Sequence, residues 1–165
     1  MSRWDLRDDV LGWRRRWRVT NDGSSEPDDG GGSISAIPPD VCLTLLAGAT
    51  VGRLAFLGHG GRIELLPVNF VAVDREIYFR TSPRGPLAAL TETPTHVAFG
   101  VDHVDSAFGQ GWNVTVRGET EGVTDPETIE RAQAAGLAVP WAGGDRTLVI
   151  RIVVAEIDGR RVSRV

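Results

Sequence analysis

The residues best suited to chemistry lie in one short stretch, Arg80–Leu87, which reads Arg-Thr-Ser-Pro-Arg-Gly-Pro-Leu. This stretch joins a strand-like run at Ile77–Phe79 to a helix-like run that starts at Leu87. Guanidinium groups, hydroxyls and free backbone N–H groups at such a corner are the donors that bind a phosphate. The alternative is a solvated turn in which Thr81 or Ser82 caps the helix. The sequence therefore predicts either an anion site or a capped turn at this corner.

Other groups of reactive residues in the sequence are less suited to forming a catalytic or metal-binding site. His59, His96 and His103 lack the i, i+4 spacing of a helical metal site, so we expect no metal. The run Asp102–Ser106 holds acid, imidazole and hydroxyl groups, yet adjacent loop residues rarely form a nucleophile–base–acid geometry, and a surface loop near the rim of the site is the simpler expectation. Cys42 lies in an apolar run and is predicted to pack in the core.

Composition narrows the class of protein. All 18 basic residues are arginine, which excludes mechanisms that need a lysine Schiff base or a P-loop lysine. A net charge of −4 and a pI near 5.4 disfavour nucleic-acid binding. No apolar run approaches the ~20 residues of a membrane span, so we expect no integral membrane association. The single cysteine cannot form an intrachain disulfide and favours a reducing cytoplasm.

The chain divides into two parts by composition. Residues 1–36 comprise an arginine- and tryptophan-rich head and a Gly/Ser/Asp linker, and residues 37–165 form the predicted folded domain. The head has the pattern of a short amphipathic helix. It is suited either to anchoring on a membrane or RNA, or to docking on its own domain or a partner subunit.

The folded part is predicted to be mainly β, with about six antiparallel strands that form a barrel. Short connections and the absence of internal repeats disfavour a Rossmann-type sheet. The expected strands are Val51–Leu57, Arg62–Val73, Glu76–Thr81, His96–Asp102, Trp112–Val123 and Thr147–Ile157, with helices near 39–47, 87–92 and 125–135.

Five blocks along the chain resemble the pyridoxamine 5′-phosphate oxidase-like family, in particular a small bacterial, often actinobacterial branch related to nitroimidazole-resistance proteins. The blocks are Val51–Phe56, Pro67–Val71, Ile77–Ser82, Gly111–Gly118 and Pro140–Ala142. The resemblance covers about Pro38 to Val162. It implies a split β-barrel that forms a homodimer, with FMN in a groove between the two subunits.

The resemblance also implies which residues hold the cofactor. Pro67, Val68 and Asn69 are expected beside the flavin ring, with main-chain atoms of Val68 and Asn69 at its polar edge. Arg80, Thr81 and Ser82, with Arg84 in the turn, match the phosphate-binding corner. Trp112 and Trp141 are expected either to cover the flavin or close a neighbouring subunit's pocket, or to be core or interface aromatics. No catalytic residue is identified, because the flavin performs the electron or hydride transfer.

At one position the sequence departs from the family pattern, and it is therefore also compatible with other functions. Where relatives usually have a lysine just before Leu87, this chain has Pro86, which offers no charge and no donor. The expected function is an FMN-dependent oxidoreductase acting on a small molecule. The alternatives are a deazaflavin-dependent reductase, whose ligand's anionic tail would follow Arg53, Arg62 and Arg84, and a non-catalytic flavin or haem-binding protein. Oxidation of pyridoxamine phosphate itself is a weaker match.

Overall fold

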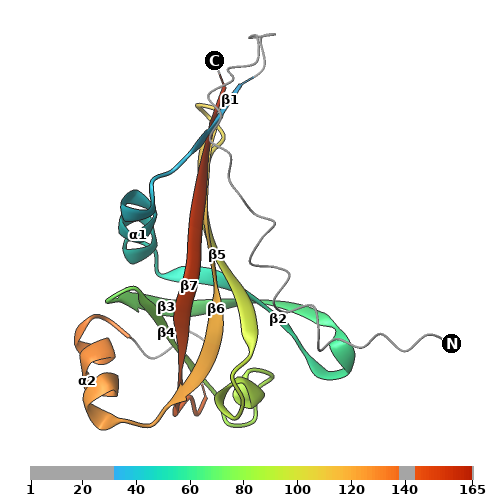
Figure 1. Cartoon of the computed structure of the whole chain (residues 1–165), viewed down its shortest axis with the longest axis vertical. Helices are drawn as coiled ribbons and strands as arrows, with labels where there is room; N and C mark the ends of the chain where they lie inside the picture. The colour runs from blue at the N-terminus through green and yellow to red at the C-terminus, as the bar shows by residue number, and fades with distance from the viewer. Residues whose placement is uncertain (1–31, 138–143, 165) are drawn as a thin grey trace, which may run out of the picture. The chain divides into compact units, whose positions relative to one another are not determined.

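The computed structural model describes residues 32–137 and 144–164. All of them belong to the second of the two compact units into which the chain divides, Gly31–Val165. The part described is built on one antiparallel sheet of seven strands in the order β1-β7-β4-β3-β2-β5-β6 (Figure 1). An additional pairing of β6 with β7 closes six of these strands into a barrel. The predicted mainly β split-barrel class is confirmed.

The strands follow the predicted order and alternation. Their bounds are β1 Ser33–Ala36, β2 Val51–Leu57, β3 Ile63–Val73, β4 Glu76–Thr81, β5 His96–Asp105, β6 Gln110–Val123 and β7 Leu148–Ser163. Because side chains alternate along a strand, Ile77 and Phe79 of β4 point into the barrel core while Tyr78 points to the opposite, outer side. The core thus lies inside the barrel, whereas α2 packs against the outer side of the sheet, which also carries the candidate site.

The barrel closes tightly around a buried aromatic pair. Phe70 and Phe99 meet edge to face, with ring centroids 4.8 Å apart. Gly52 of β2 lies directly beneath Phe99, where a Cβ would come within 2.1 Å of the ring. A side chain at position 52 is therefore sterically excluded unless Phe99 moves.

Two helices pack on different parts of the sheet. Helix α1, Pro39–Ala47, buries Cys42 and Leu46 against the barrel, and burial raises the pKa of the Cys42 thiol. Cys42 is thus a packing residue, as predicted. Helix α2, Pro126–Ala134, begins at Asp125, whose carboxylate accepts a hydrogen bond from the backbone N–H of Thr128. The predicted helix after Leu87 is a short 3-10 helix, Ala88–Thr91.

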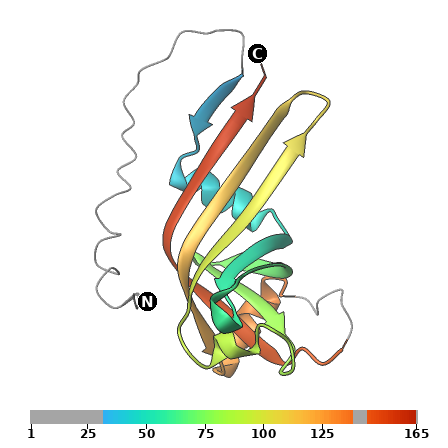
Figure 2. The ribbon, with the colours of Figure 1, turned by 90° about the vertical axis from the view of Figure 1, so that its right-hand side faces the viewer.

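The sheet extends beyond α1 as an arm that the sequence did not indicate. We define the arm as Ser33–Ala36, Asp102–Trp112 and Arg160–Ser163; Figure 2 shows these strands continuing past α1. Strand β7 supports it on both edges, because its last residues pair with β1 on one side and with β6 on the other.

The arm corrects two sequence-based expectations. The predicted head and linker reached residue 36, whereas Ser33–Ala36 forms β1, a strand of four exposed residues that is too short to stand out from the Gly/Ser-rich segment before it. The predicted loop at Asp102–Ser106 was also wrong. Its residues up to Asp105 belong to β5 and pair with β6, since backbone pairing there does not require apolar side chains. In the described part of the chain, neither helix has the length and apolar content needed to cross a bilayer.

Candidate functional site

The predicted phosphate corner begins at Arg80, near the end of β4. Arg80 lies on the outer side of the barrel with Tyr78, two residues earlier on the strand. Its Nε atom is buried and has no hydrogen-bond partner among the residues that the structure describes. A buried donor without an acceptor is costly, and such an atom in a native fold calls for a ligand, an ion or a water. Arg80 is thus prepared to bind an acceptor.

The turn after Arg80 is held by its own hydrogen bonds. The Gly85 N–H donates to the Ser82 carbonyl at 3.0 Å, and the Ala88 N–H donates to the Gly85 carbonyl at 3.1 Å. The Arg84 N–H donates to Ser82 Oγ at 3.3 Å, which leaves the Ser82 hydroxyl hydrogen for another acceptor. The guanidinium of Arg84 is exposed, with no ion pair within the described ranges. Arg84 is therefore available to an anion.

Thr81 differs from its neighbours in this corner. It is 2% exposed and shares the inner side of β4 with Phe79. Its side chain therefore lies on the side opposite to Arg80, because consecutive residues of a strand face opposite ways. Of the predicted phosphate ligands, Arg80, Ser82 and Arg84 have side chains accessible from outside the core, and Thr81 offers its main chain.

The predicted ring-contact residues lie on β3, next to β4. Phe70 pairs with Phe79 in the β3–β4 ladder, so the antiparallel register places Asn69 opposite Arg80 at the next position. Pro67 and Asn69 lie on the outer side, whereas Val68 is 8% exposed and points into the core. Pro67, Asn69 and Arg80 therefore share one outer surface, and Val68 contributes through its backbone, as predicted.

Trp112 lies far from this surface. On β7, Val149 pairs with Arg80, whereas Arg161, twelve residues later, pairs with Trp112. An extended strand of that length spans about 40 Å. Within one chain the structure therefore does not bring Trp112 to the Arg80 corner. Trp141 lies outside the described residues.

Trp112 has its own surroundings on the arm. Its ring stacks on the ring of His103, with centroids 6.2 Å apart and planes 29° apart. The two rings line a hollow of about 260 Å³ together with Asp105, Gln110, Gly111 and Arg161. Trp112 was singled out from the sequence, but this hollow was not predicted, because the residues that line it come from three different strands.

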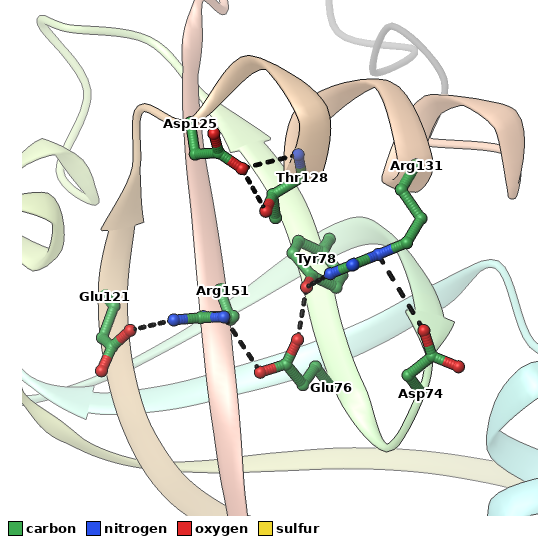
Figure 3. Close-up of polar contacts among 8 residues, drawn as sticks. All are labelled: Asp74, Glu76, Tyr78, Glu121, Asp125, Thr128, Arg131 and Arg151. Atoms are coloured by element: carbon green, nitrogen blue, oxygen red, sulfur yellow. Dashed lines mark hydrogen bonds and ion pairs between the residues drawn. The ribbon is translucent and has the colours of Figure 1, made fainter.

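A polar network covers the outer side of β4 (Figure 3). Arg80 lies on the same side of this strand. The Tyr78 hydroxyl, on a side chain that is 1% exposed, donates to Glu76 Oε2 and accepts from Arg131 Nη2 at 3.4 Å. Arg151 of β7 donates to Glu76 at 3.1 Å and also to Glu121 of β6. The network links α2 to three strands. This network was not predicted from the sequence. The alternation of the polar residues Glu76, Tyr78 and Arg80 with the apolar residues Ile77 and Phe79 indicates a polar outer side of β4 and could have suggested it.

The network also shifts the titration of its members. The hydrogen bond to Glu121 raises the pKa of Arg151, and the hydrogen bond to Tyr78 raises the pKa of Arg131. At the start of α2, the hydrogen bonds from Thr128 lower the pKa of Asp125. These groups are charged near neutral pH. In the described ranges no three metal-binding side chains come together.

Apolar side chains form a stripe on the outer surface of the β2–β3 hairpin. Leu57, Ile63 and Leu65 are 63%, 79% and 60% exposed. Leu57 pairs directly with Ile63, and Leu65 is two residues further along β3 toward Pro67. We call these three residues the apolar stripe. It adjoins the surface that carries Pro67 and Asn69.

Comparisons with known proteins agree with this fold. The sequence profile of the family described as pyridoxamine 5′-phosphate oxidase matches residues 38–161. An uncharacterized protein of Mycobacterium tuberculosis is 28% identical over 127 residues, which are 74% of this chain and 82% of that protein. A solved FAD binding protein of Mycobacterium smegmatis has a TM-score of 0.67 and 29% identity, covering 78% of this chain and 98% of that one. A conserved protein of unknown function from Corynebacterium diphtheriae has a TM-score of 0.64 and 29% identity, over 80% and 98%.

Proposed function

Because the chain belongs to the pyridoxamine 5′-phosphate oxidase family, we propose that it is a flavin-dependent oxidoreductase that acts on a small molecule. A flavin would supply the electron or hydride transfer. The residues of this chain would bind the flavin phosphate, orient the ring and exclude water. No acid or base from the chain is required for that role.

The observation that carries the proposal is the position of Arg80 on the outer side of β4, opposite Asn69 of β3, with an Nε atom that has no partner among the described residues. A phosphate oxygen is the acceptor that a guanidinium binds best, because the bond is charge-assisted. Arg84 and the Ser82 hydroxyl lie in the following turn and add donors to the same corner. The residues present therefore fit a phosphorylated cofactor even though Pro86 replaces the lysine usual in the family.

The ring would lie along the outer side of β3. Pro67 and Asn69 are on the same outer surface as Arg80, and this strand runs away from the phosphate corner. Main-chain atoms of Val68 and Asn69 would meet the polar edge of the ring. This arrangement places the charged end at Arg80 and the uncharged residues Pro67 and Asn69 along the strand, which suits the phosphate and the ring of a flavin mononucleotide.

We further propose that the site is completed by a second copy of the chain. Trp112 and Arg80 are about 40 Å apart along one β7, so both can contact one flavin only if they come from different subunits. The apolar stripe supports this homodimer, since exposed apolar surface next to a site favours a protein interface. A two-fold dimer would form two equivalent sites.

Three cofactors compete for this site. FMN needs only the phosphate corner and the ring surface. FAD is favoured by the relative described as an FAD binding protein, at 29% identity. A deazaflavin with a long anionic tail requires further free arginines, and Arg53 is instead paired with Asp102. We therefore rank FMN and FAD above a deazaflavin.

Cofactor binding is tested by reconstitution. Purified protein is titrated separately with FMN, FAD and a deazaflavin, with flavin fluorescence as the readout. Arg80→Ala should raise the Kd of the bound flavin by about tenfold to a hundredfold, the loss of one charge-assisted contact. Arg62→Ala, which removes an exposed arginine before β3, is the matched control and should leave the Kd values for FMN and FAD unchanged. Equal Kd values for the wild type and Arg80→Ala would reject the proposed site.

Turnover is tested separately from binding. If the chain is an oxidoreductase, a nicotinamide cofactor or another reductant should bleach the absorbance of the bound flavin, and a small-molecule acceptor should restore it. A bound flavin that no reductant bleaches would favour the alternative, a non-catalytic flavin carrier.

A further inference from the structure

We propose that the hollow on the arm is an adenine-nucleotide site, which takes the adenosine diphosphate part of FAD. This inference rests on the proposed flavin function but concerns the part of the cofactor that lies beyond the flavin mononucleotide. It is carried by the hollow lined by His103, Asp105, Gln110, Trp112 and Arg161.

The hollow has a flat aromatic wall. Trp112 is partly buried against the core, and the exposed imidazole of His103 stacks on it with planes 29° apart. Nucleobases stack on such aromatic surfaces. The two rings lie beyond the end of the barrel core, where backbone pairing alone is enough to hold the strands together. Their stacking therefore suits the binding of a ligand.

Arg161 supplies the positive charge. It pairs with Trp112 across the β6–β7 ladder, and its exposed guanidinium makes no ion pair with any residue in the ranges that the structure describes. It also lines a second, neighbouring hollow of about 140 Å³ beside Ile37, Pro38 and Val41. A guanidinium between two hollows is placed to bind the phosphates of a ligand whose base occupies the aromatic side.

Gln110 and Asp105 favour adenine among the bases. A glutamine amide can bind adenine in a bidentate manner, because it accepts from N6 and donates to N7. The Oδ1 atom of Asp105 accepts the backbone N–H groups of Ala107 and Phe108 at 3.1 and 3.2 Å. Its other oxygen remains an acceptor for an amino group, and a carboxylate there disfavours placing a phosphate at that end of the hollow.

The position of the hollow agrees with the proposed dimer. If the arm of one subunit closes over the cofactor bound at the Arg80 corner of its partner, the part of a dinucleotide beyond the first phosphate extends toward the arm. Arg161 would then contact the outer phosphate, and the stacked rings would contact the base. An FMN molecule would leave this hollow vacant, so the hollow predicts a preference for FAD.

The test uses the full-length chain and two arginine variants. Arg161→Gln removes the charge from the hollow, and Arg160→Gln is the matched control on the adjacent residue of β7, which faces the opposite side. The wild type should bind FAD at least about tenfold more tightly than FMN, and Arg161→Gln should lose that preference while its Kd for FMN stays the same. Arg160→Gln should behave like the wild type.

The remaining outcomes separate this inference from the proposed function. ADP alone should bind the wild type in calorimetry and bind Arg161→Gln about tenfold more weakly. Absence of ADP binding to the wild type overturns the adenine site, whatever the flavins do. An equal loss of FMN and FAD in Arg161→Gln also overturns it, because Arg161 would then serve the mononucleotide part. If ADP binds but no flavin does, the proposed function fails and the nucleotide site stands.

Discussion

The Nη1 atom of Arg151 donates a hydrogen bond to Oε1 of Glu76 at 3.1 Å and thereby ties β7 to β4 on the side that carries Arg80. Arg151 is 30% exposed and Glu76 23% exposed, so the pair is only partly screened by solvent. Arg151 also bonds Glu121 on β6. One guanidinium therefore connects three neighbouring strands at the place where the barrel closes.

Replacing Arg151 should weaken the fold. Arg151→Met keeps an apolar stem but leaves the carboxylates of Glu76 and Glu121 without their cation. We expect the free energy of unfolding to fall by roughly 1–3 kcal/mol, measured by urea denaturation. Arg160→Met, an exposed residue of the same strand, should change it by less than about 0.5 kcal/mol. Similar losses in both variants would show that the network contributes nothing specific.

The Asp125 cap at the start of α2 should lose its stabilising effect at low pH. Hydrogen bonds from Thr128 lower the pKa of Asp125 below its ordinary value of 3.8. Because the folded-state pKa is the lower one, this stabilisation is complete above the ordinary value and is lost as pH falls through the folded-state value. Between about pH 6 and about pH 3, the Tm of the wild type should therefore fall further than that of Asp125→Asn. Glu127→Gln removes a carboxylate from the same turn and is the control, because its Tm should fall with pH as much as that of the wild type. If the Tm of Glu127→Gln falls less than that of the wild type, the Asp125 cap is not the cause of the pH dependence.

Much of the barrel could be predicted from the sequence because its strands are rich in β-branched and aromatic residues and are bounded by turn-forming residues. The bounds of β2 and β4 agree with prediction to the residue, and β3 starts one residue later. The sequence carries no clear signal where burial is missing. The arm lies beyond the core and its residues are mostly exposed, so its strands depend on pairing with distant parts of the chain.

The candidate site was only partly predictable for a related reason. A local motif identified Arg80, Ser82 and Arg84, but grouped them with Thr81, whose strand position turns its side chain into the core. The link between Asn69 and Arg80 depends on the β3–β4 register, which a hairpin turn signal suggests without fixing. The distance between Trp112 and Arg80 is a property of the folded β7, and no spacing in the sequence reports it.

A side chain at position 52 should disturb the core. The Cβ of Gly52→Ala would approach the Phe99 ring to 2.1 Å, and Phe99 is fully buried. We expect a loss of roughly 1–3 kcal/mol in the free energy of unfolding. Combining Gly52→Ala with Phe99→Leu should cost less than the sum of the single changes, since the smaller side chain makes room. Gly48→Ala, where the nearest atoms are 3.7 Å away, is the control, and full additivity of the first pair would contradict the proposed clash.

The apolar stripe should contribute to the dimer. Leu65 is 60% exposed in one chain, and Leu65→Glu would place a charge in the apolar stripe that is proposed to contact the second subunit. The dimer dissociation constant, measured by analytical ultracentrifugation, should rise by about tenfold or more. Ala89→Glu, at an exposed position outside the stripe, should leave it unchanged. A wild type that is monomeric at all concentrations would remove the basis of this prediction and of the shared site.

A mixing experiment distinguishes a shared site from two separate ones. Arg80→Ala and Trp112→Ala should each bind FAD poorly as homodimers, because every site lacks one contact. In a heterodimer, one site carries both defects and the other carries none. After equal amounts exchange subunits at random, half of the dimers are mixed, so about a quarter of all sites should regain wild-type affinity. FAD bound per chain, at a FAD concentration near the wild-type Kd, measures this fraction. Arg80→Ala mixed with itself is the control, and no recovery in the mixed sample would mean that Arg80 and Trp112 do not serve one flavin.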